Sequence, residues 1–110
     1  MAFMVRFSIG AHRDLRAIHA YIHKNDSREN ADYVARGIVR TALKLRDLPV
    51  RGAHPPELLR LKNFTYRQIF FKPYRIVYRI RANTVFIALI ADGRRDMKSL
   101  LMQRFKKDLT

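Results

Sequence analysis

The sequence has no cysteine and no tryptophan among its 110 residues, and only four glycines and four prolines. Without cysteine, a disulfide framework, thiol catalysis and zinc sites with cysteine ligands are excluded. No apolar run approaches the roughly 20 residues that span a bilayer, and the N-terminal residues lack the pattern of a secretory signal. We therefore expect a cytoplasmic protein that does not enter a membrane.

Acidic residues are also scarce. The chain has 23 Lys and Arg against 9 Asp and Glu, a formal net charge of +14. Hydrophobic residues make up 48% of the chain, enough to form a core, so residues 1–110 are predicted to be a single domain. A surplus of this size attracts polyanions: nucleic acid, an acidic protein segment or an anionic membrane surface.

The positive charge is concentrated in the middle of the chain. Residues 51–81 carry eight basic side chains and one acidic side chain, which is half of the whole surplus. Strand patterns begin in the same stretch, so we expect the charge to lie on a sheet. Most of these cations are arginines, whose forked donors suit phosphate and carboxylate oxygens.

Apolar periodicity and turn residues predict an α+β fold. A short strand over 2–7 is followed by a helical hairpin, with helices over 11–24 and 28–47 that are capped by Ser8 and Ser27. Strands are predicted over 58–61, 66–71, 74–81 and 84–90, with a final helix after Asp96. Because the later connections are short, we expect an antiparallel sheet of three to four strands with a C-terminal helix.

An anion site on the sheet is the first candidate for function. Arg67 and Arg75 lie on neighbouring predicted strands, and Arg94 and Arg95 follow the next strand. If these side chains converge at one end of the sheet, they can grip phosphates or stabilise charge in phosphodiester cleavage. The alternative is a solvated basic face. The candidate anion- or target-binding residues are Arg67, Arg75, Arg79, Arg94 and Arg95.

Other chemistries have weaker support. His19 and His23 have a spacing that can chelate a metal, but no third ligand is evident beyond Asp26, so we predict no metal site. No glycine-rich phosphate loop and no catalytic triad is recognisable, and no cofactor is expected. Aromatic and basic residues interleave over 64–79, as in sites for single-stranded nucleic acid, although packing in the sheet core also accounts for the aromatics.

Several motifs occur in a fixed order along nearly the whole chain. They include Asp14-Leu15-x-x-Ile18-x-x-Tyr21, Pro73-Tyr74-Arg75-Ile76-Val77-Tyr78 and Asp92-Gly93-Arg94-Arg95-Asp96. In this order the sequence resembles the RelE/ParE superfamily of type II toxins. The resemblance implies a growth-inhibiting toxin of a plasmid-stabilisation module. It also implies a partner, a cognate antitoxin with an acidic segment, in a toxin–antitoxin hetero-oligomer.

The superfamily divides by target. RelE-like members cut messenger RNA on the ribosome, and the resemblance then assigns catalytic roles to Arg67, Arg75 and Arg95. ParE-like members inhibit DNA gyrase and need no nuclease site. The expected tyrosine of the last helix is Leu101 here, and the expected histidine is Asp92. Arginine stays charged and cannot act as a base, so a ParE-like toxin is favoured. The alternatives are a RelE-like endoribonuclease and a small basic nucleic-acid-binding module.

Overall fold

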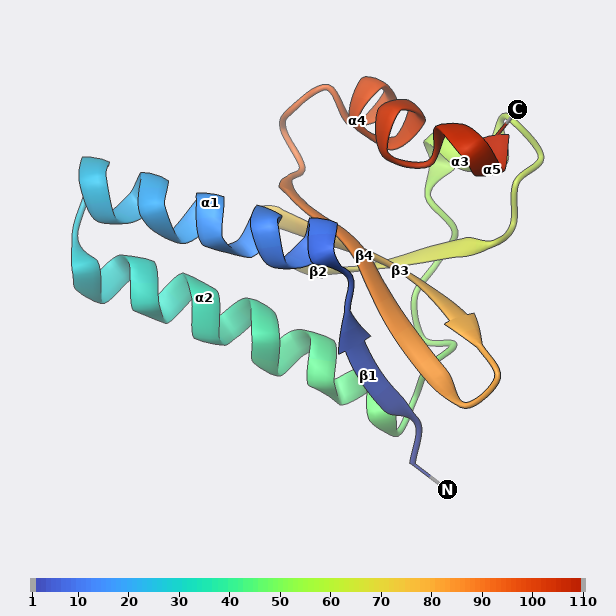
Figure 1. Ribbon diagram of the computed structural model, residues 1–110, viewed down its shortest axis with the longest axis horizontal. Helices are drawn as coiled ribbons and strands as arrows, with labels where there is room; N and C mark the ends of the chain where they lie inside the picture. Colours follow the sequence, from blue (N-terminus) through green and yellow to red (C-terminus); the bar gives the residue numbers. More distant parts are fainter. Residues whose placement is uncertain (1, 110) are drawn as a thin grey trace.

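A computed structural model describes residues 2–109 as one four-stranded sheet flanked by helices (Figure 1). The strands β1 (Met4–Phe7), β2 (Tyr66–Phe71), β3 (Tyr74–Arg81) and β4 (Thr84–Asp92) lie in the order β1-β4-β3-β2. The last three strands pair antiparallel, as predicted. Strand β1 pairs parallel with β4, so the sheet is mixed, and β4 lies inside it as its apolar sequence predicted.

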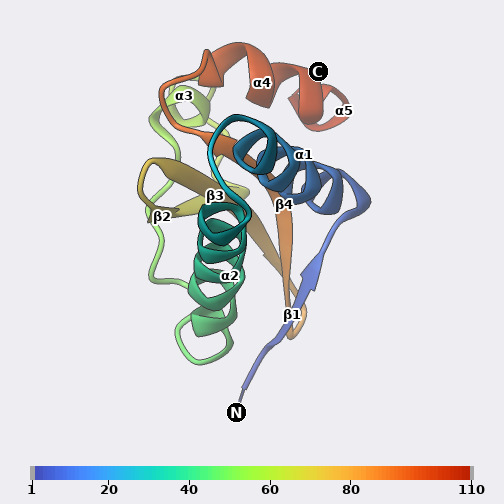
Figure 2. The same ribbon diagram turned by 90° about the vertical axis from the view of Figure 1, so that its left-hand side faces the viewer.

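The predicted helical hairpin is confirmed. It consists of α1 (Ile9–Asn25) and α2 (Arg28–Leu43), and the short 3₁₀ helix η1 (Lys44–Arg46) continues α2. The hydroxyls of Ser8 and Ser27 cap the two helices by accepting hydrogen bonds of 3.0 Å from backbone N–H groups. The hairpin packs along one side of the sheet (Figure 2). Within residues 2–109, no helix is both long enough and apolar enough to span a membrane.

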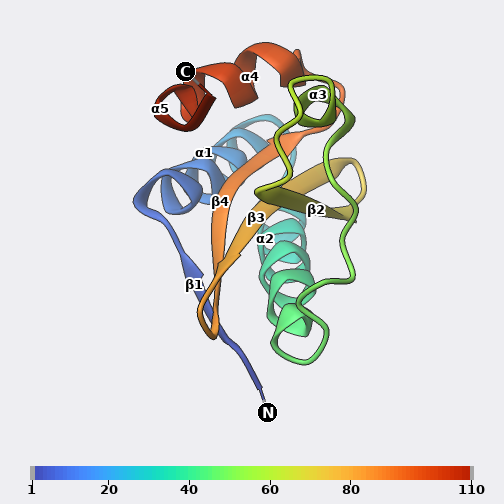
Figure 3. The same ribbon diagram turned by 90° about the vertical axis from the view of Figure 1, so that its right-hand side faces the viewer.

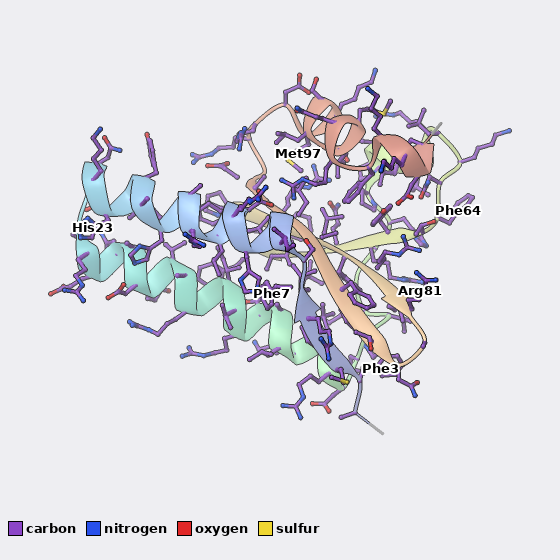
Figure 4. The ribbon with its side chains drawn as sticks, viewed as in Figure 1. Phe3, Phe7, His23, Phe64, Arg81 and Met97 are labelled. Carbon is purple, nitrogen blue, oxygen red and sulfur yellow. The ribbon has the colours of Figure 1, made fainter. Side chains whose placement is uncertain are left out.

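Three further helices cover part of the other side of the sheet: α3 (Pro56–Leu59), α4 (Met97–Arg104) and α5 (Lys106–Leu109). Figure 1 shows them grouped together, away from the hairpin. Helix α4 begins after Asp96, as predicted, and the carboxylate of Asp96 accepts a hydrogen bond from Ser99 N. Met97 lies between α4 and the sheet (Figure 4).

The prediction of a strand over 58–61 is wrong. Leu58 and Leu59 instead belong to helix α3, and residues 60–62 form a turn. Pro55 caps the helix and Pro56 is its first residue, a position that suits proline, and Pro55 O accepts hydrogen bonds from both Leu58 N and Leu59 N. The apolar character of this segment reflects the burial of Leu58 under α4 rather than strand pairing.

The two faces of the sheet have separate cores. The hairpin face is the face that packs against α1 and α2; the opposite face is the one that α3, α4 and α5 partly cover. Strand β3 alternates between them, because Ile76 and Tyr78 belong to the hairpin-side core while Val77 belongs to the other. This alternation, which the sequence predicted, determines where each arginine of the strand lies.

Candidate functional site

Arg75 lies on the opposite face of the sheet, where it is buried and fully engaged. Its guanidinium donates to both carboxylate oxygens of Glu57, with Nη2–Oε1 at 2.8 Å and Nη1–Oε2 at 2.9 Å. Arg75 Nε also donates to Gln68 Oε1 at 2.8 Å. Only 9% of the Arg75 side chain is exposed. Hydrogen bonding from Arg75 lowers the pKa of Glu57 below its usual value, so the pair stays ionised.

Arg67 does not join Arg75. In the ladder between β2 and β3, Arg67 lies opposite Tyr78 and Phe70 lies opposite Arg75. Side chains three residues apart on one strand point to different faces, so Arg67 is on the hairpin face and Arg75 is not. Arg67 Nη1 donates to Gly52 O at 2.7 Å and to Val50 O at 3.2 Å. The predicted convergence of these two arginines is therefore wrong.

The register that separates the two arginines has a visible signal in the sequence. Only Lys72 and Pro73 connect β2 to β3, which places Phe71 opposite Tyr74 and fixes every later pair of the ladder. The residues of β2 that share a face with Arg75 are Tyr66, Gln68 and Phe70, and none of them is a cation. Counting from this turn finds the separation without a structure.

Arg67 and Tyr78 both bind the loop between η1 and α3. The Tyr78 hydroxyl donates to Pro49 O at 2.7 Å and accepts from Gly52 N at 3.0 Å. A Cβ on Gly52 would lie 2.6 Å from Gln68 O and 2.7 Å from the Tyr78 oxygen, so this close approach requires glycine. Arg67 and Tyr78 thus have structural roles in anchoring residues 49–52.

Arg79 lies two residues beyond Val77 on the opposite face, at the edge of the cover formed by α4 and α5. Its Nη1 is 3.5 Å from Asp108, and its guanidinium carbon lies 5.6 Å from the centre of the Tyr66 ring. The Tyr66 hydroxyl donates to Asp108, and its ring stacks on Phe105 at 4.0 Å. Burial, followed by the hydrogen bond to Asp108, raises the pKa of Tyr66 to about 12. Tyr66 therefore keeps its proton at neutral pH.

Arg94 and Arg95 lie in the turn after β4 and are exposed. Arg94 forms a pair with Asp92, with Nη2–Oδ2 at 2.6 Å and Nε–Oδ1 at 2.9 Å. This hydrogen bond lowers the pKa of Asp92. Within residues 2–109, the Arg95 side chain forms no hydrogen bond and no ion pair. Arg95 is therefore the candidate whose guanidinium is free to bind an anion.

A groove of about 510 Å³ lies between α1 and the turn that carries Arg94 and Arg95. Its lining is mixed: aliphatic residues, two tyrosines, two carboxylates and the two arginines. The lining residues are Asp14, Ala17, Ile18, Tyr21, Ile22, Tyr74, Ile90, Ala91, Asp92, Arg94 and Arg95. Its volume is within the range of sites for small ligands or for side chains of a partner.

Both carboxylates of the groove are already neutralised by arginine. Asp14 Oδ1 accepts from Arg104 Nη2 at 2.8 Å, and Asp14 Oδ2 accepts from Arg104 Nη1 at 3.0 Å and from Ile90 N at 2.9 Å. Asp92 is held by Arg94. The uncompensated charge at the groove is consequently the positive charge of Arg95. Asp14 joins α1, β4 and α4, a role that sequence reasoning missed because its partners are 76 and 90 residues away.

His19 and His23 of α1 contact neighbouring side chains. His19 Nε2 lies 2.7 Å from Asp32 Oδ1 on the neighbouring helix, and its ring stacks on His23 at 6.2 Å. No cluster of three or more metal-ligating side chains occurs in the part of the chain that the structure describes. The contact between His19 and Asp32 joins α1 to α2.

Two solved structures share this fold. The structure of the chromosomal ParDE toxin–antitoxin system from P. aeruginosa is similar with a TM-score of 0.70 and 19% identity, over 83% of this chain and 96% of that chain. The toxin–antitoxin complex RelBE2 from Mycobacterium tuberculosis is similar with a TM-score of 0.61 and 23% identity, over 84% and 92%. These likenesses show that the chain shares its fold with the two solved structures.

The family of the chain follows from its sequence. A model of the ParE toxin of the type II toxin–antitoxin system parDE matches residues 5–97, so this chain belongs to the ParE toxin family. No curated protein matches the sequence. The protein is therefore the toxin of a type II toxin–antitoxin pair, and the resemblance found in the sequence is confirmed.

Proposed function

We propose that this toxin inhibits growth by binding a large host target in the cytoplasm, without cleaving RNA. The target that we propose is DNA gyrase. The state of Arg75 carries this proposal. A nuclease needs an accessible cation beside the scissile phosphate and a group that exchanges a proton. Arg75 is instead buried, and its charge is neutralised by Glu57.

The neighbours of Arg75 support the same reading. Gln68 and Phe70 share its face on β2, and neither side chain can act as an acid or a base. Tyr66 also shares that face, but its hydroxyl is hydrogen-bonded to Asp108 and its pKa is raised to about 12. Arg67 lies on the other face of the sheet, so the RelE-like set of Arg67, Arg75 and Arg95 is not assembled at one site.

Overproduction of the toxin tests the target. We expect growth arrest with intact messenger RNA ends, together with loss of supercoiling by purified gyrase when the purified toxin is added. Arg95→Ala removes an exposed guanidinium without touching the core, whereas Arg13→Ala removes an equal charge from the exposed side of α1. We expect Arg95→Ala to weaken gyrase inhibition more than Arg13→Ala. Codon-phased cleavage of translated messenger RNA would instead establish the RelE-like alternative.

We further propose that the antitoxin places an acidic segment, with an apolar side chain, in the groove beside α1. Arg95 supplies an unpaired positive charge there, and Ile18, Ile22 and Ile90 supply apolar surface. Opposite charges steer association, so the association rate should fall as salt is raised, and Arg95→Gln should lower it more than Arg13→Gln. An association rate that is insensitive to ionic strength contradicts this electrostatic account.

A further inference from the structure

The helices leave part of the opposite face of the sheet uncovered. Figure 3 shows β1, β4 and the end of β3 facing the viewer below α3, α4 and α5, with no helix in front of them. The uncovered part contains two exposed arginines, Arg6 on β1 and Arg81 at the end of β3. Figure 4 shows Arg81 pointing away from the rest of the molecule. We call this area the open platform: Met4, Arg6, Arg79, Arg81, Thr84 and Phe86.

The register places cations on both sides of an aromatic ring. Arg6 pairs with Phe86 in the ladder of β1 and β4, and Phe86 pairs with Arg79 in the ladder of β3 and β4. The three side chains therefore form one row across three strands, with Phe86 at its centre. Strands lie about 4.8 Å apart, so the two flanking arginines start about 10 Å from each other.

The open platform has almost no negative charge. Asp92 is the single carboxylate within β1–β4, and it lies opposite Tyr74, which packs on the hairpin face. Asp108 of α5 reaches the border of the platform and pairs with Arg79. In the described residues 2–109, the side chains of Arg6 and Arg81 form no hydrogen bond and no ion pair. Two guanidinium groups are thus free beside a partly exposed ring.

We propose that the open platform binds single-stranded nucleic acid through its sugar–phosphate backbone and one stacked base, without cleaving it. A nucleotide presents both a phosphate for arginine and a flat base for an aromatic ring, and such stacking is tolerant of sequence. An acidic peptide matches the arginines but has no flat group for Phe86. This activity is separate from the groove beside α1 and from the inhibition of gyrase.

The test is binding of a fluorescein-labelled oligothymidylate to the full chain, followed by fluorescence anisotropy over a series of NaCl concentrations. Two double variants that remove the same charge are compared: Arg6→Gln with Arg81→Gln on the platform, and Arg13→Gln with Arg40→Gln on the exposed sides of α1 and α2. A plot of log affinity against log salt has a negative slope, and each phosphate contact that is lost reduces the magnitude of this slope by about 0.7. The magnitude should therefore fall by about 1.4 in the platform variant and stay unchanged in the control variant.

Replacement of Phe86 by leucine isolates stacking from charge. Phe86→Leu retains an apolar side chain and should weaken binding by about fivefold or more with no change in slope. Thermal melting confirms that each variant is folded. If the platform double variant is unfolded, Arg81→Gln alone, at the exposed end of β3, should lower the slope by about 0.7.

Three results would overturn the proposal. Equal losses in the two double variants would mean that net charge alone attracts the oligonucleotide. An unchanged affinity in Phe86→Leu would show that no base stacks on Phe86. The third result is displacement of the oligonucleotide by poly-glutamate at equal charge concentration, with the two double variants ranked in the same order by their affinity for poly-glutamate as by their affinity for the oligonucleotide. This result would assign the platform to an acidic protein segment.

Discussion

The buried pair of Arg75 and Glu57 gives the sharpest test of how this fold is held together. Glu57→Gln removes the negative charge and one of two strong hydrogen bonds but preserves the shape of the side chain. Arg75 keeps its hydrogen bond to Gln68, so the loss is that of a charge-assisted hydrogen bond, about 1.5–3 kcal/mol. Removing every partner of a buried ion would cost about 3–5 kcal/mol.

That loss converts into a measurable shift of Tm. Unfolding entropy is about 2.1 cal/mol/K per residue, hence about 230 cal/mol/K for 110 residues. A loss of about 1.5–3 kcal/mol therefore lowers Tm by about 6–13 °C. Urea unfolding at neutral pH gives the free energy directly, with the m-value as a check on two-state behaviour.

A double-mutant cycle shows whether the loss of stability comes from the interaction between Arg75 and Glu57 or from a change in the local geometry around Glu57. Glu57→Leu leaves a guanidinium with 9% of its side chain exposed, whereas Arg75→Met leaves a carboxylate with 19% exposed. We expect Glu57→Leu to be the more destabilising single change, and the double variant to be less destabilising than Glu57→Leu alone. A coupling energy near zero, or a loss of less than about 0.5 kcal/mol in Glu57→Gln, would refute the reasoning.

Three further predictions concern stability. Because the folded-state pKa of Glu57 is below its usual value of 4.5, its contribution is complete at neutral pH and is lost as the pH falls below about 4.5; the difference in unfolding free energy between the wild type and Glu57→Gln should shrink over that range. Asp14→Ala should lower the unfolding free energy by about 2–3 kcal/mol in urea, because Ile90 N loses its acceptor and Arg104 loses its ionic partner and keeps only its hydrogen bond to Ala88 O. Gly37→Ala should destabilise by about 1–3 kcal/mol in thermal melts despite the better helix propensity of alanine, because its Cβ would lie 2.2 Å from the ring of Phe71; an increase in Tm would contradict this packing.

Local patterns predicted most of the fold. The caps at Ser8 and Ser27, the hairpin helices and the last three strands follow from residues close in sequence, and the structure confirms them. The parallel pairing of β1 with β4 could not be predicted in this way, because it joins residues 80 positions apart. The short helix α3 could not be predicted, because its leucines fit a strand as well as a helix. Only the burial of Leu58 under α4 distinguishes the two.

The candidate site was predicted less well, for a related reason. Whether an arginine binds an external anion depends on what else reaches it, and Glu57 reaches Arg75 from helix α3, 18 residues earlier. Arg67 and Arg75 are separated because successive side chains of a strand alternate between the two faces of the sheet. A register shift of one residue would move a side chain to the other face. The exposure of Arg94 and Arg95 follows from their place in a turn.

The clamp at Asp14 has a consequence for synthesis of the chain. Asp14 leaves the ribosome early, together with the hairpin, but its partner Arg104 emerges 90 residues later. When β4 emerges, Ile90 N can already donate to Asp14, but the charge of the Asp14 carboxylate has no ionic partner until Arg104 follows. The salt bridge that ties α1 to α4 therefore forms among the last contacts of the fold. A nascent chain would neutralise both carboxylates of the groove only when nearly all of the described residues have emerged.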